Sequence, residues 1–405
     1  MSRPTLELAD IFRRHGTEYQ QVHGTTITLW QRRVLRAIEL CRTAVLGGHR
    51  DQCDRCGHQR ISYNSCRNRH CPKCQSLAKA KWLQARQAEL LPVEYFHVVF
   101  TIPQTIAPVA LQNKRVVYGI LFRAVAETLL QIARDPRHLG AKIGFLAVLH
   151  TWGQNLLHHP HLHCVVPGGG MSPDGLRWVP CRPGFFLPVQ VLSRLFRGKF
   201  LAYLRQAFDS EKLRFHGMLA YLADPAAFRS FMQQTRKIEW VVYCKPPFGG
   251  PAQVLDYLGR YTHRVAISNH RLVQLQDGKV TFRWKDYRHG DQLRLMTLDA
   301  HEFIRRFLLH VLPPGFTRLR HYGLLGSRNR AQKLSKCQEL IQQAQASPFD
   351  DRHIPNSKSL YETLTGHSLD MCPACRLGHM VCVEILVSAV RLPIRRATRL
   401  RMDSS

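Results

Sequence analysis

The chain has 405 residues, which is long enough for two or three domains with a substantial buried core. Lys and Arg number 58 against 28 Asp and Glu, and this formal charge of +30 favours a nucleic-acid partner. No long basic amphipathic helix, no leader-like apolar segment at the start and no run of about 18 apolar residues stands out in the sequence, which disfavours membrane binding, secretion and membrane insertion.

The first 90 residues are predicted to be helical on either side of a short cysteine-rich segment. Within 1–50, apolar residues recur at helical spacing until Gly47-Gly48 ends the pattern. These periodic residues are Trp30, Val34, Ile38, Cys41 and Val45. A second helix is predicted over 77–91, stopped by Pro92.

The cysteine-rich segment between these helices has the spacing of a zinc site. Two CxxC pairs flank a loop, and each pair can place two thiolates on one ion, so that four complete a tetrahedron. The predicted ligands of this structural zinc are Cys53, Cys56, Cys71 and Cys74. Cys66 and His70 are surplus to four ligands: one of them can substitute for a ligand, or the site is more complex. CxxC pairs without a secretion signal favour metal ligation over disulfides, and hence a reducing cytoplasm.

The loop between the two cysteine pairs is basic. Arg67 and Arg69 lie in it, and we expect them to contact DNA phosphates, with plain solubility as the alternative role.

The middle of the chain alternates strands and helices. Strands are predicted over 97–103, 143–154, 161–167 and 239–248, and helices over 106–134 and 185–235. The polar, proline-containing stretch between the second and third strands is typical of a hairpin connection.

The strand 161–167 carries a His-Leu-His motif. Alternate side chains of a strand share a face, so His161 and His163 point the same way while Leu162 points into the core. Two imidazoles on a rigid strand can bind a divalent ion and leave positions open for a phosphate oxygen. In a hairpin that pairs Gln154 with His161, the amide oxygen of Gln154 becomes the third ligand, and His150 is the alternative.

A helix is predicted from Gly249-Gly250-Pro251 to about residue 261, and it carries two tyrosines. Tyr257 and Tyr261 are four residues apart and share one face of this helix. Such a pair is often a packing stripe, but a phenolate can also attack a phosphodiester. Arg260 and Arg264 are then placed to hold phosphates.

The last third of the chain returns to short strands and then helices. Strands are predicted over 265–268, 271–276 and 279–287, and helices over 300–312 and 328–346. Cys372 and Cys375 form a further CxxC pair, followed by His379 and Cys382, with no clear partner pair. Half of a zinc ribbon and a remnant of a site are both open interpretations. The whole pattern predicts an α+β fold, an antiparallel sheet with helices packed on it and small metal-bound additions at either end.

These pieces resemble the HUH endonucleases, and more specifically the rolling-circle transposases of bacterial insertion sequences in the family named after insertion sequence ninety-one. The segments that carry the resemblance are 65–75, 97–103, 149–170, 257–271 and 303–325. The resemblance implies a helical, zinc-binding domain over 1–90, an HUH nuclease core with a tyrosine helix and a helical insertion over 91–290, and a helical C-terminal region with the CxxC segment and a basic tail over 291–405.

The resemblance also implies the reaction. Tyr257 or Tyr261 attacks a single-stranded DNA phosphate at the ends of the element, beside Mg²⁺ or Mn²⁺, and becomes a 5′-phosphotyrosine. The sequence has no GxxxxGK[ST] loop, so strand unwinding depends on a host helicase, and we expect a cytoplasmic, nucleoid-associated protein.

Two alternative functions stay open at this point. A non-enzymatic zinc-finger DNA-binding regulator explains the charge and the cysteines but leaves the histidine strand and the tyrosine helix without a role. A plasmid replication initiator or relaxase uses the same chemistry for another purpose.

Overall fold

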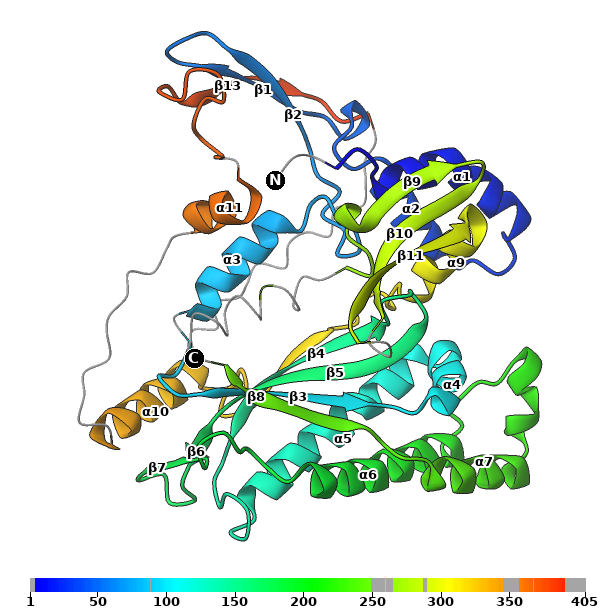
Figure 1. The fold of residues 1–405 in the computed structure, drawn as a ribbon, viewed down its shortest axis with the longest axis vertical. Helices are drawn as coiled ribbons and strands as arrows, with labels where there is room; N and C mark the ends of the chain where they lie inside the picture. The colour runs from blue at the N-terminus through cyan, green and yellow to red at the C-terminus, as the bar shows by residue number, and fades with distance from the viewer. Residues whose placement is uncertain are drawn as a thin grey trace.

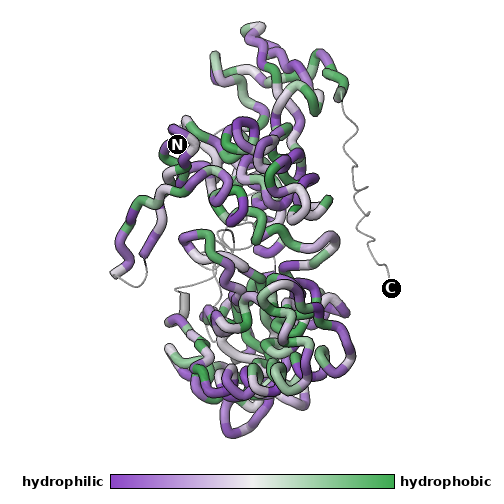
Figure 2. The backbone as a smooth tube through the Cα atoms, turned by 90° about the vertical axis from the view of Figure 1, so that its right-hand side faces the viewer, coloured by the Kyte–Doolittle hydropathy of each residue, from purple (hydrophilic) through white to green (hydrophobic). Residues whose placement is uncertain are grey.

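The computed structural model describes residues 4–389 except 88, 249–258, 260–264, 287–289, 345–356 and 367. Figure 1 shows a lower body built on a central sheet and an upper body that contains the N-terminal helices. In Figure 2 hydrophobic and hydrophilic positions alternate through both bodies, as expected for elements that each bury one face. The predicted α+β class, with antiparallel sheets and helices, is confirmed.

The central sheet has five antiparallel strands in the order β12-β4-β5-β3-β8. Their bounds are β3 Tyr95–Thr101, β4 Gly144–Trp152, β5 His158–Pro167, β8 Val242–Phe248 and β12 Leu319–Gly323. β4 and β5 form the predicted hairpin at the centre of the sheet. β12 also belongs to this sheet, although it lies beyond residue 290, where the third domain is predicted to begin. The domain boundaries remain predictions.

One face of the central sheet is covered by helices. Phe96, Leu149 and Leu162 alternate with outward residues on their strands and lie in the largest hydrophobic core, together with these helices. The helices are α4 Ala107–Gln112, α5 Lys114–Arg134, α6 Val189–Asp209 and α7 Pro225–Lys237. Among the described helices, α5 alone is long and apolar enough to cross a membrane, but 67% of its apolar window is buried, as in the core helix of a soluble protein.

The opposite face of the sheet contacts α3, Ser76–Gln87. Leu83 of this helix is buried in a small cluster with Tyr95 of β3, Val148 of β4 and Val165 of β5. These strand residues have the opposite parity to those of the large core, so α3 packs on the face that the helices α4–α7 leave uncovered.

The upper body combines the N-terminal helices with elements from residues 272–309. Helices α1 and α2 pack with α9 and with a three-stranded sheet in the order β11-β10-β9, around one hydrophobic cluster (Figure 1). Their bounds are α1 Leu8–Val22, α2 Leu29–Glu39, β9 Leu272–Gln276, β10 Lys279–Asp286, β11 Gln292–Asp299 and α9 Ala300–Leu309. Asp277 and Gly278 both have positive φ, as the predicted two-residue hairpin turn requires.

A second small sheet joins the two ends of the described chain. Its order is β13-β1-β2, and Figure 1 shows the blue strands β1 and β2 beside the red strand β13. The bounds are β1 Gly48–Cys53, β2 Gln59–Tyr63 and β13 Met380–Leu386. The remaining elements are η1 Ala44–Leu46, η2 Gln104–Ile106, β6 Gly169–Met171, β7 Trp178–Pro180, η3 Gly217–Ala223, η4 Asn269–Arg271, α10 Arg330–Ala344 and α11 Ser357–Thr365.

Two predicted elements differ from the structure. The segment 265–268 is not a strand: it bends, and Ala266 and Ile267 are buried in the core of the upper body. A short apolar run is buried equally well by a bend or a strand, so its composition could not decide between them. The prediction of helix for 1–50 also missed β1, whose partners lie outside that window.

Candidate metal centres

Three histidines converge on the face of the central sheet that α3 covers in part. His161 and His163 lie on β5 with Leu162 buried on the opposite face, as the alternation predicts. On β4, His150 lies directly opposite His161, and Val148 lies opposite His163. Their possible ligand atoms all lie within 4.8 Å of one another. A rigid hairpin therefore brings three imidazoles to one point.

The ring geometry of this histidine cluster suits a single ion. The centroid of His150 lies 4.4 Å from that of His163 and 5.7 Å from that of His161, and the two β5 rings are 4.8 Å apart. Trp152 stacks on His150 at 4.8 Å and covers one side of it. Three protein nitrogens leave a divalent ion further positions for substrate oxygens, as in catalytic sites.

Hydrogen bonds orient two of these imidazoles. Nδ1 of His161 lies 2.6 Å from the carbonyl oxygen of His159 and must donate to it, so Nε2 keeps its lone pair. Nδ1 of His163 lies 2.8 Å from Nε2 of His97, on the neighbouring strand β3. Such partners fix the ring and the tautomer of a metal-binding histidine.

His97 is a residue that the sequence reasoning missed. It is only 2% exposed, and its ring stacks on that of His163 with an interplanar angle of 3°. Burial, with Lys245 and His161 adding to it, lowers the pKa of His97 to about 3, so the ring stays neutral near pH 7. In the sequence, the available signal for His97 was its position as the first residue of the strand predicted over 97–103.

The predicted pairing of Gln154 with His161 is wrong. His150 pairs with His161, and the register then shifts so that Trp152 faces His158. Gln154 lies beyond the end of β4 in the connecting turn, where Arg271 donates to its backbone carbonyl. Pro160 supplies no N–H to the ladder, and a proline within a strand typically accompanies such an irregularity. His150, the alternative ligand, takes the position next to both β5 histidines.

The two tyrosines, with Arg260 and Arg264, lie outside the described residues. Gly259, which lies between Tyr257 and Tyr261 in the chain, is described and buried. A Cβ atom added to it would lie 2.8 Å from Cε of Lys79 and 2.9 Å from Cδ1 of Leu83, both on α3. Gly259 therefore contacts the helix that packs on the histidine-bearing face of the sheet.

The cysteines form two separate groups, which corrects the single predicted site. Cys71 and Cys74 lie with Cys41 and Cys66, and Cys53 and Cys56 lie with Cys372 and Cys375. In each group the four sulfur atoms lie within 4.8 Å of one another. The structure thus does not bring the four predicted ligands together; each CxxC pair has other partners.

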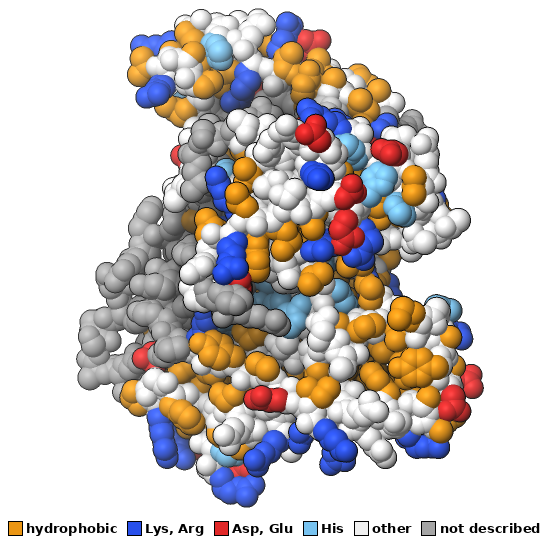
Figure 3. All heavy atoms as spheres, turned by 45° about the vertical axis from the view of Figure 1, so that its right-hand side comes forward, with side chains coloured by type: hydrophobic (Ala, Val, Ile, Leu, Met, Phe, Trp, Pro, Cys, Tyr) orange, Lys and Arg blue, Asp and Glu red, His pale blue; other side chains and the backbone are white. Residues whose placement is uncertain are grey.

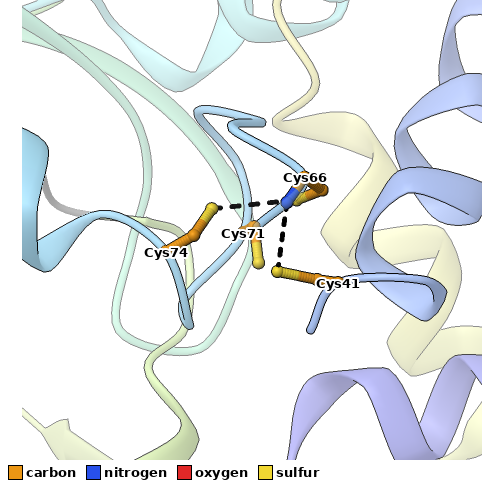
Figure 4. A group of neighbouring side chains, drawn as sticks. All are labelled: Cys41, Cys66, Cys71 and Cys74. Atoms are coloured by element: carbon orange, nitrogen blue, oxygen red, sulfur yellow. Dashed lines mark hydrogen bonds between the residues drawn. The ribbon is translucent and has the colours of Figure 1, made fainter. Parts of the chain in front are cut away.

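The first group is drawn in Figure 4. The sulfur atoms of Cys66 and Cys74 are 3.7 Å apart, and the backbone N–H of Cys66 points at the sulfur of Cys41. Hydrogen bonds from the thiols of Cys66, Cys71 and Cys74 hold the pKa of Cys41 far below its usual range. Four converging sulfurs are the donor set of a closed structural zinc site.

Cys41 was hidden in the sequence because it continues an apolar helical stripe. It lies two residues after the end of α2 and is fully buried. His70, which was surplus in the sequence, is buried and belongs to neither cysteine group of the described chain. In the sequence Cys66 lies four residues before His70. That spacing did not indicate that Cys66 shares a group with Cys41, 25 positions earlier.

The two basic residues of the finger loop differ in their surroundings. Arg67 is exposed, with φ at 52°. Arg69 donates to the backbone carbonyls of Pro313 and Phe316, so its guanidinium holds the turn before β12. Solvent and DNA phosphates therefore have less access to Arg69 than the sequence predicted, and its contact with DNA is not supported by this geometry.

Comparisons with known proteins agree with this arrangement. A family described as "Transposase zinc-binding domain" matches residues 11–102, and a family described as "Putative transposase" matches residues 144–333. The chain is 63% identical over 385 residues to a protein from Sinorhizobium fredii named "Putative transposase y4qJ", which covers 95% of this chain and 96% of that protein. The chain belongs to the transposase family of insertion sequence ninety-one.

A more distant relative has the same character. The transposase for insertion sequence element IS801 from Pseudomonas savastanoi pv. phaseolicola is 28% identical over 311 residues, 76% of this chain and 73% of the relative. No solved structure matches the chain. The zinc-binding match contains the whole first cysteine group, and the transposase match contains the histidine cluster, so structural zinc and a DNA partner are both supported in this transposase.

Proposed function

We propose that this transposase cuts and rejoins single-stranded DNA at the ends of its element by the HUH mechanism. The observation that carries the proposal is the cluster of His150, His161 and His163 on one sheet face, oriented by further hydrogen bonds. In Figure 3 histidine side chains reach the surface between the two bodies, with basic side chains nearby. A negatively charged strand can approach such a surface.

The proposed nucleophiles are Tyr257 and Tyr261. The phenol oxygen of one tyrosine bonds to the scissile phosphorus, and the bond from phosphorus to the 3′ oxygen breaks. The products are a 5′-phosphotyrosine and a free 3′-hydroxyl, which takes up one proton, so the number of phosphoester bonds is unchanged and no nucleotide is consumed. The position of Gly259 against α3, on the histidine-bearing side of the sheet, supports this assignment.

The histidines would hold Mg²⁺ or Mn²⁺, which supplies Lewis-acid polarisation of the scissile phosphate. The chain itself orients the two imidazoles of β5. The carbonyl of His159 holds Nε2 of His161 available, and His97, which stays neutral because of its low pKa, can accept from Nδ1 of His163. Arg260 and Arg264 are proposed to hold flanking phosphates. Arg67 is proposed to contact DNA from the loop between Cys56 and Cys71.

The two tyrosines are proposed to act in turn. An element excised as a single strand must be opened at one end and resolved at the other, and a second phenol takes the second cut without release of the first. A host helicase would separate the strands. The proposal places the protein in the cytoplasm beside the nucleoid and keeps the domains at 1–90, 91–290 and 291–405.

A non-enzymatic DNA-binding regulator explains the cysteine groups equally well. It does not explain three convergent histidines with two orienting partners, since imidazoles held in this way are typical of a working metal site. Membership of a transposase family also favours DNA strand transfer over a replication initiator.

The full-length protein incubated with single-stranded oligonucleotides from the element ends tests the proposal. We expect metal-dependent covalent adducts on denaturing gels, lost in His161→Ala/His163→Ala and in Tyr257→Phe/Tyr261→Phe. The matched controls His138→Ala and Tyr221→Phe, which change exposed residues outside the cluster, should keep the adduct. Each single tyrosine variant should retain some adduct but lose transposition. Adduct formation by the double tyrosine variant would refute the assigned nucleophiles.

A further inference from the structure

The second cysteine group joins parts of the chain that are far apart in sequence. Cys53 is the last residue of β1 and Cys56 follows this strand, whereas Cys372 and Cys375 precede β13. The zinc-binding family match ends at residue 102 and so contains only half of this group. We infer that Cys53, Cys56, Cys372 and Cys375 bind a second structural zinc ion, which attaches the C-terminal strand β13 to the N-terminal strand β1.

The spacing of the sulfur atoms is that of a metal site. Sγ of Cys53 lies 3.7 Å from Sγ of Cys375, and Sγ of Cys56 lies 3.7 Å from Sγ of Cys372. With Zn–S bonds of about 2.3 Å, a regular tetrahedron places its sulfurs about 3.8 Å apart. A disulfide needs about 2.05 Å, so these contacts are too long for one. Two of the sulfur-sulfur distances therefore match those around one zinc ion, and all four sulfur atoms lie within 4.8 Å of one another.

Backbone N–H groups point at the sulfurs from both sides of the group. The N–H groups of Arg55 and Cys56 approach Sγ of Cys53, and the N–H of Gly378 approaches Sγ of Cys375 at 3.4 Å. Each CxxC turn thus forms a tight knuckle whose amides face a sulfur. Amides placed in this way donate to thiolates, which is the form of cysteine that a metal binds.

The two knuckles fit closely against each other. A Cβ at Gly378 would lie 2.5 Å from Sγ of Cys53 and 2.6 Å from Oδ1 of Asp54, so only glycine allows this approach. The backbone N–H of His379 donates to Oδ1 of Asp54 at 2.8 Å, and the N–H of Asp54 donates to the carbonyl of His379. The contacts between the two segments are therefore specific and reciprocal.

The β-sheet continues the same connection. β1 pairs with β13 from Gly48 opposite Leu386 to Cys53 opposite Met380. The proposed ion lies at the end of this ladder and closes a loop of more than 300 residues, since Cys56 and Cys372 are 316 positions apart. Closing so long a loop constrains the unfolded chain strongly, so the ion is expected to keep β13 attached. This inference does not depend on the proposed HUH chemistry.

Zinc measurement on the full-length protein tests the inference. The background is His161→Ala/His163→Ala, so that the histidine cluster adds no metal. We expect about two zinc ions per chain, and about one after either Cys372→Ser/Cys375→Ser or Cys53→Ser/Cys56→Ser. The control Cys382→Ser changes an exposed cysteine of β13 outside both groups and should keep about two. Two ions retained without Cys372 and Cys375 would overturn the inference.

Alkylation mapped by mass spectrometry tests the inference first in the unmodified protein and then in a variant. Cys56 is exposed, so N-ethylmaleimide can reach it in the native protein, and a bound ion should protect its thiol. A zinc chelator should make it reactive. In Cys372→Ser/Cys375→Ser, Cys53 and Cys56 should become reactive while Cys71 and Cys74 stay protected, which also shows that the first group is folded. A reactive Cys56 in the zinc-loaded native protein, or joint loss of protection in both groups, would contradict the inference.

Discussion

Replacement of His97 by phenylalanine tests whether His97 orients the proposed metal ligand His163, because it leaves all three proposed ligands unchanged. His97 is buried, its ring stacks on His163, and its Nε2 lies 2.8 Å from Nδ1 of that residue. Phenylalanine keeps a flat ring in the same space but removes the hydrogen bond. If His163 held an ion through Nε2, its Nδ1 would carry a proton, and in His97→Phe that proton would have no acceptor at this position.

The expected loss follows from two independent magnitudes. An unsatisfied buried donor costs about 1–3 kcal/mol, and loss of a partner that orients a metal-binding histidine weakens metal affinity about 10- to 100-fold. At about 1.4 kcal/mol per tenfold change, the two ranges agree. The cost applies to the metal-bound state, because without metal His163 can move its proton to Nε2.

The assay is a Mn²⁺ titration of covalent adduct formation. In His97→Phe the half-saturating Mn²⁺ concentration should rise about 10- to 100-fold, while the adduct at saturating Mn²⁺ recovers. His97→Gln restores an amide oxygen near the position of Nε2 and should recover most of the affinity. Thermal unfolding without metal should be similar in both variants. An unchanged half-saturation in His97→Phe, or an equal defect in both variants at saturating Mn²⁺, would refute the orienting role.

Three further outcomes are expected. Because Mg²⁺ is a hard cation that binds oxygen ligands, three imidazoles should hold it more weakly than Mn²⁺. Adducts should therefore form at lower Mn²⁺ than Mg²⁺ concentrations in parallel titrations, and a preference for Mg²⁺ would point to an oxygen ligand. Arg67→Ala should weaken single-stranded DNA binding and lower its salt dependence by about one ion in a salt titration. Arg69→Ala loses the hydrogen bonds to the carbonyls of Pro313 and Phe316, so it should mainly lower the unfolding temperature in a melting curve. The reverse pattern would contradict the structure. Burial lowers the pKa of His310 to about 3. As pH falls below about 6.5, the unfolded chain gains a proton that folded His310 does not take up, so the stability of the fold declines toward pH 3. In urea unfolding, His310→Asn should reduce the difference in unfolding free energy between pH 7 and pH 5 by about 2 kcal/mol, and an unchanged difference would count against a neutral buried His310.

The local parts of the histidine site were predictable from sequence. The alternation of His161, Leu162 and His163 on a strand places two imidazoles on one face, and the structure has them so. The third ligand depends on the register of the hairpin, which the register shift between His150 and Trp152 sets. A change of a few residues in register exchanges Gln154 for His150, so alternation alone could not decide between them.

The cysteine pairing illustrates what local spacing cannot supply. Each CxxC turn is a local structure and is readable in the sequence. The choice of which two pairs share an ion depends on long-range contacts, such as the pairing of β1 with β13 and the burial of Cys41 after α2. The nearest pairs in sequence, Cys53/Cys56 and Cys71/Cys74, therefore formed a plausible site that the fold divides between two groups.

The contact between Gly259 and α3 offers a test of the tyrosine segment that leaves both tyrosines and all the histidines unchanged. A Cβ at Gly259 would lie 2.9 Å and 3.3 Å from the two methyl carbons of Leu83, and 2.8 Å from Cε of Lys79. Lys79 has a flexible end that can move, but Leu83 is buried between α3 and the sheet. Gly259→Ala should therefore displace the segment from α3 by a fraction of an ångström or more.

Such a displacement should reduce the rate of adduct formation without changing metal affinity. A misplacement of about 1 Å can cost about 100-fold in rate, so a loss of about 10- to 100-fold is expected at saturating Mn²⁺, with the half-saturating concentration as in the wild type. Leu83→Ala removes the methyl groups that the new Cβ would meet, and in the double variant Gly259→Ala should cost much less than it does alone. This coupling is the decisive measurement, because a cavity at Leu83 only destabilises the fold and cannot by itself restore activity. If Gly259→Ala costs the same with and without Leu83, the tyrosine segment does not depend on its contact with α3 for catalysis.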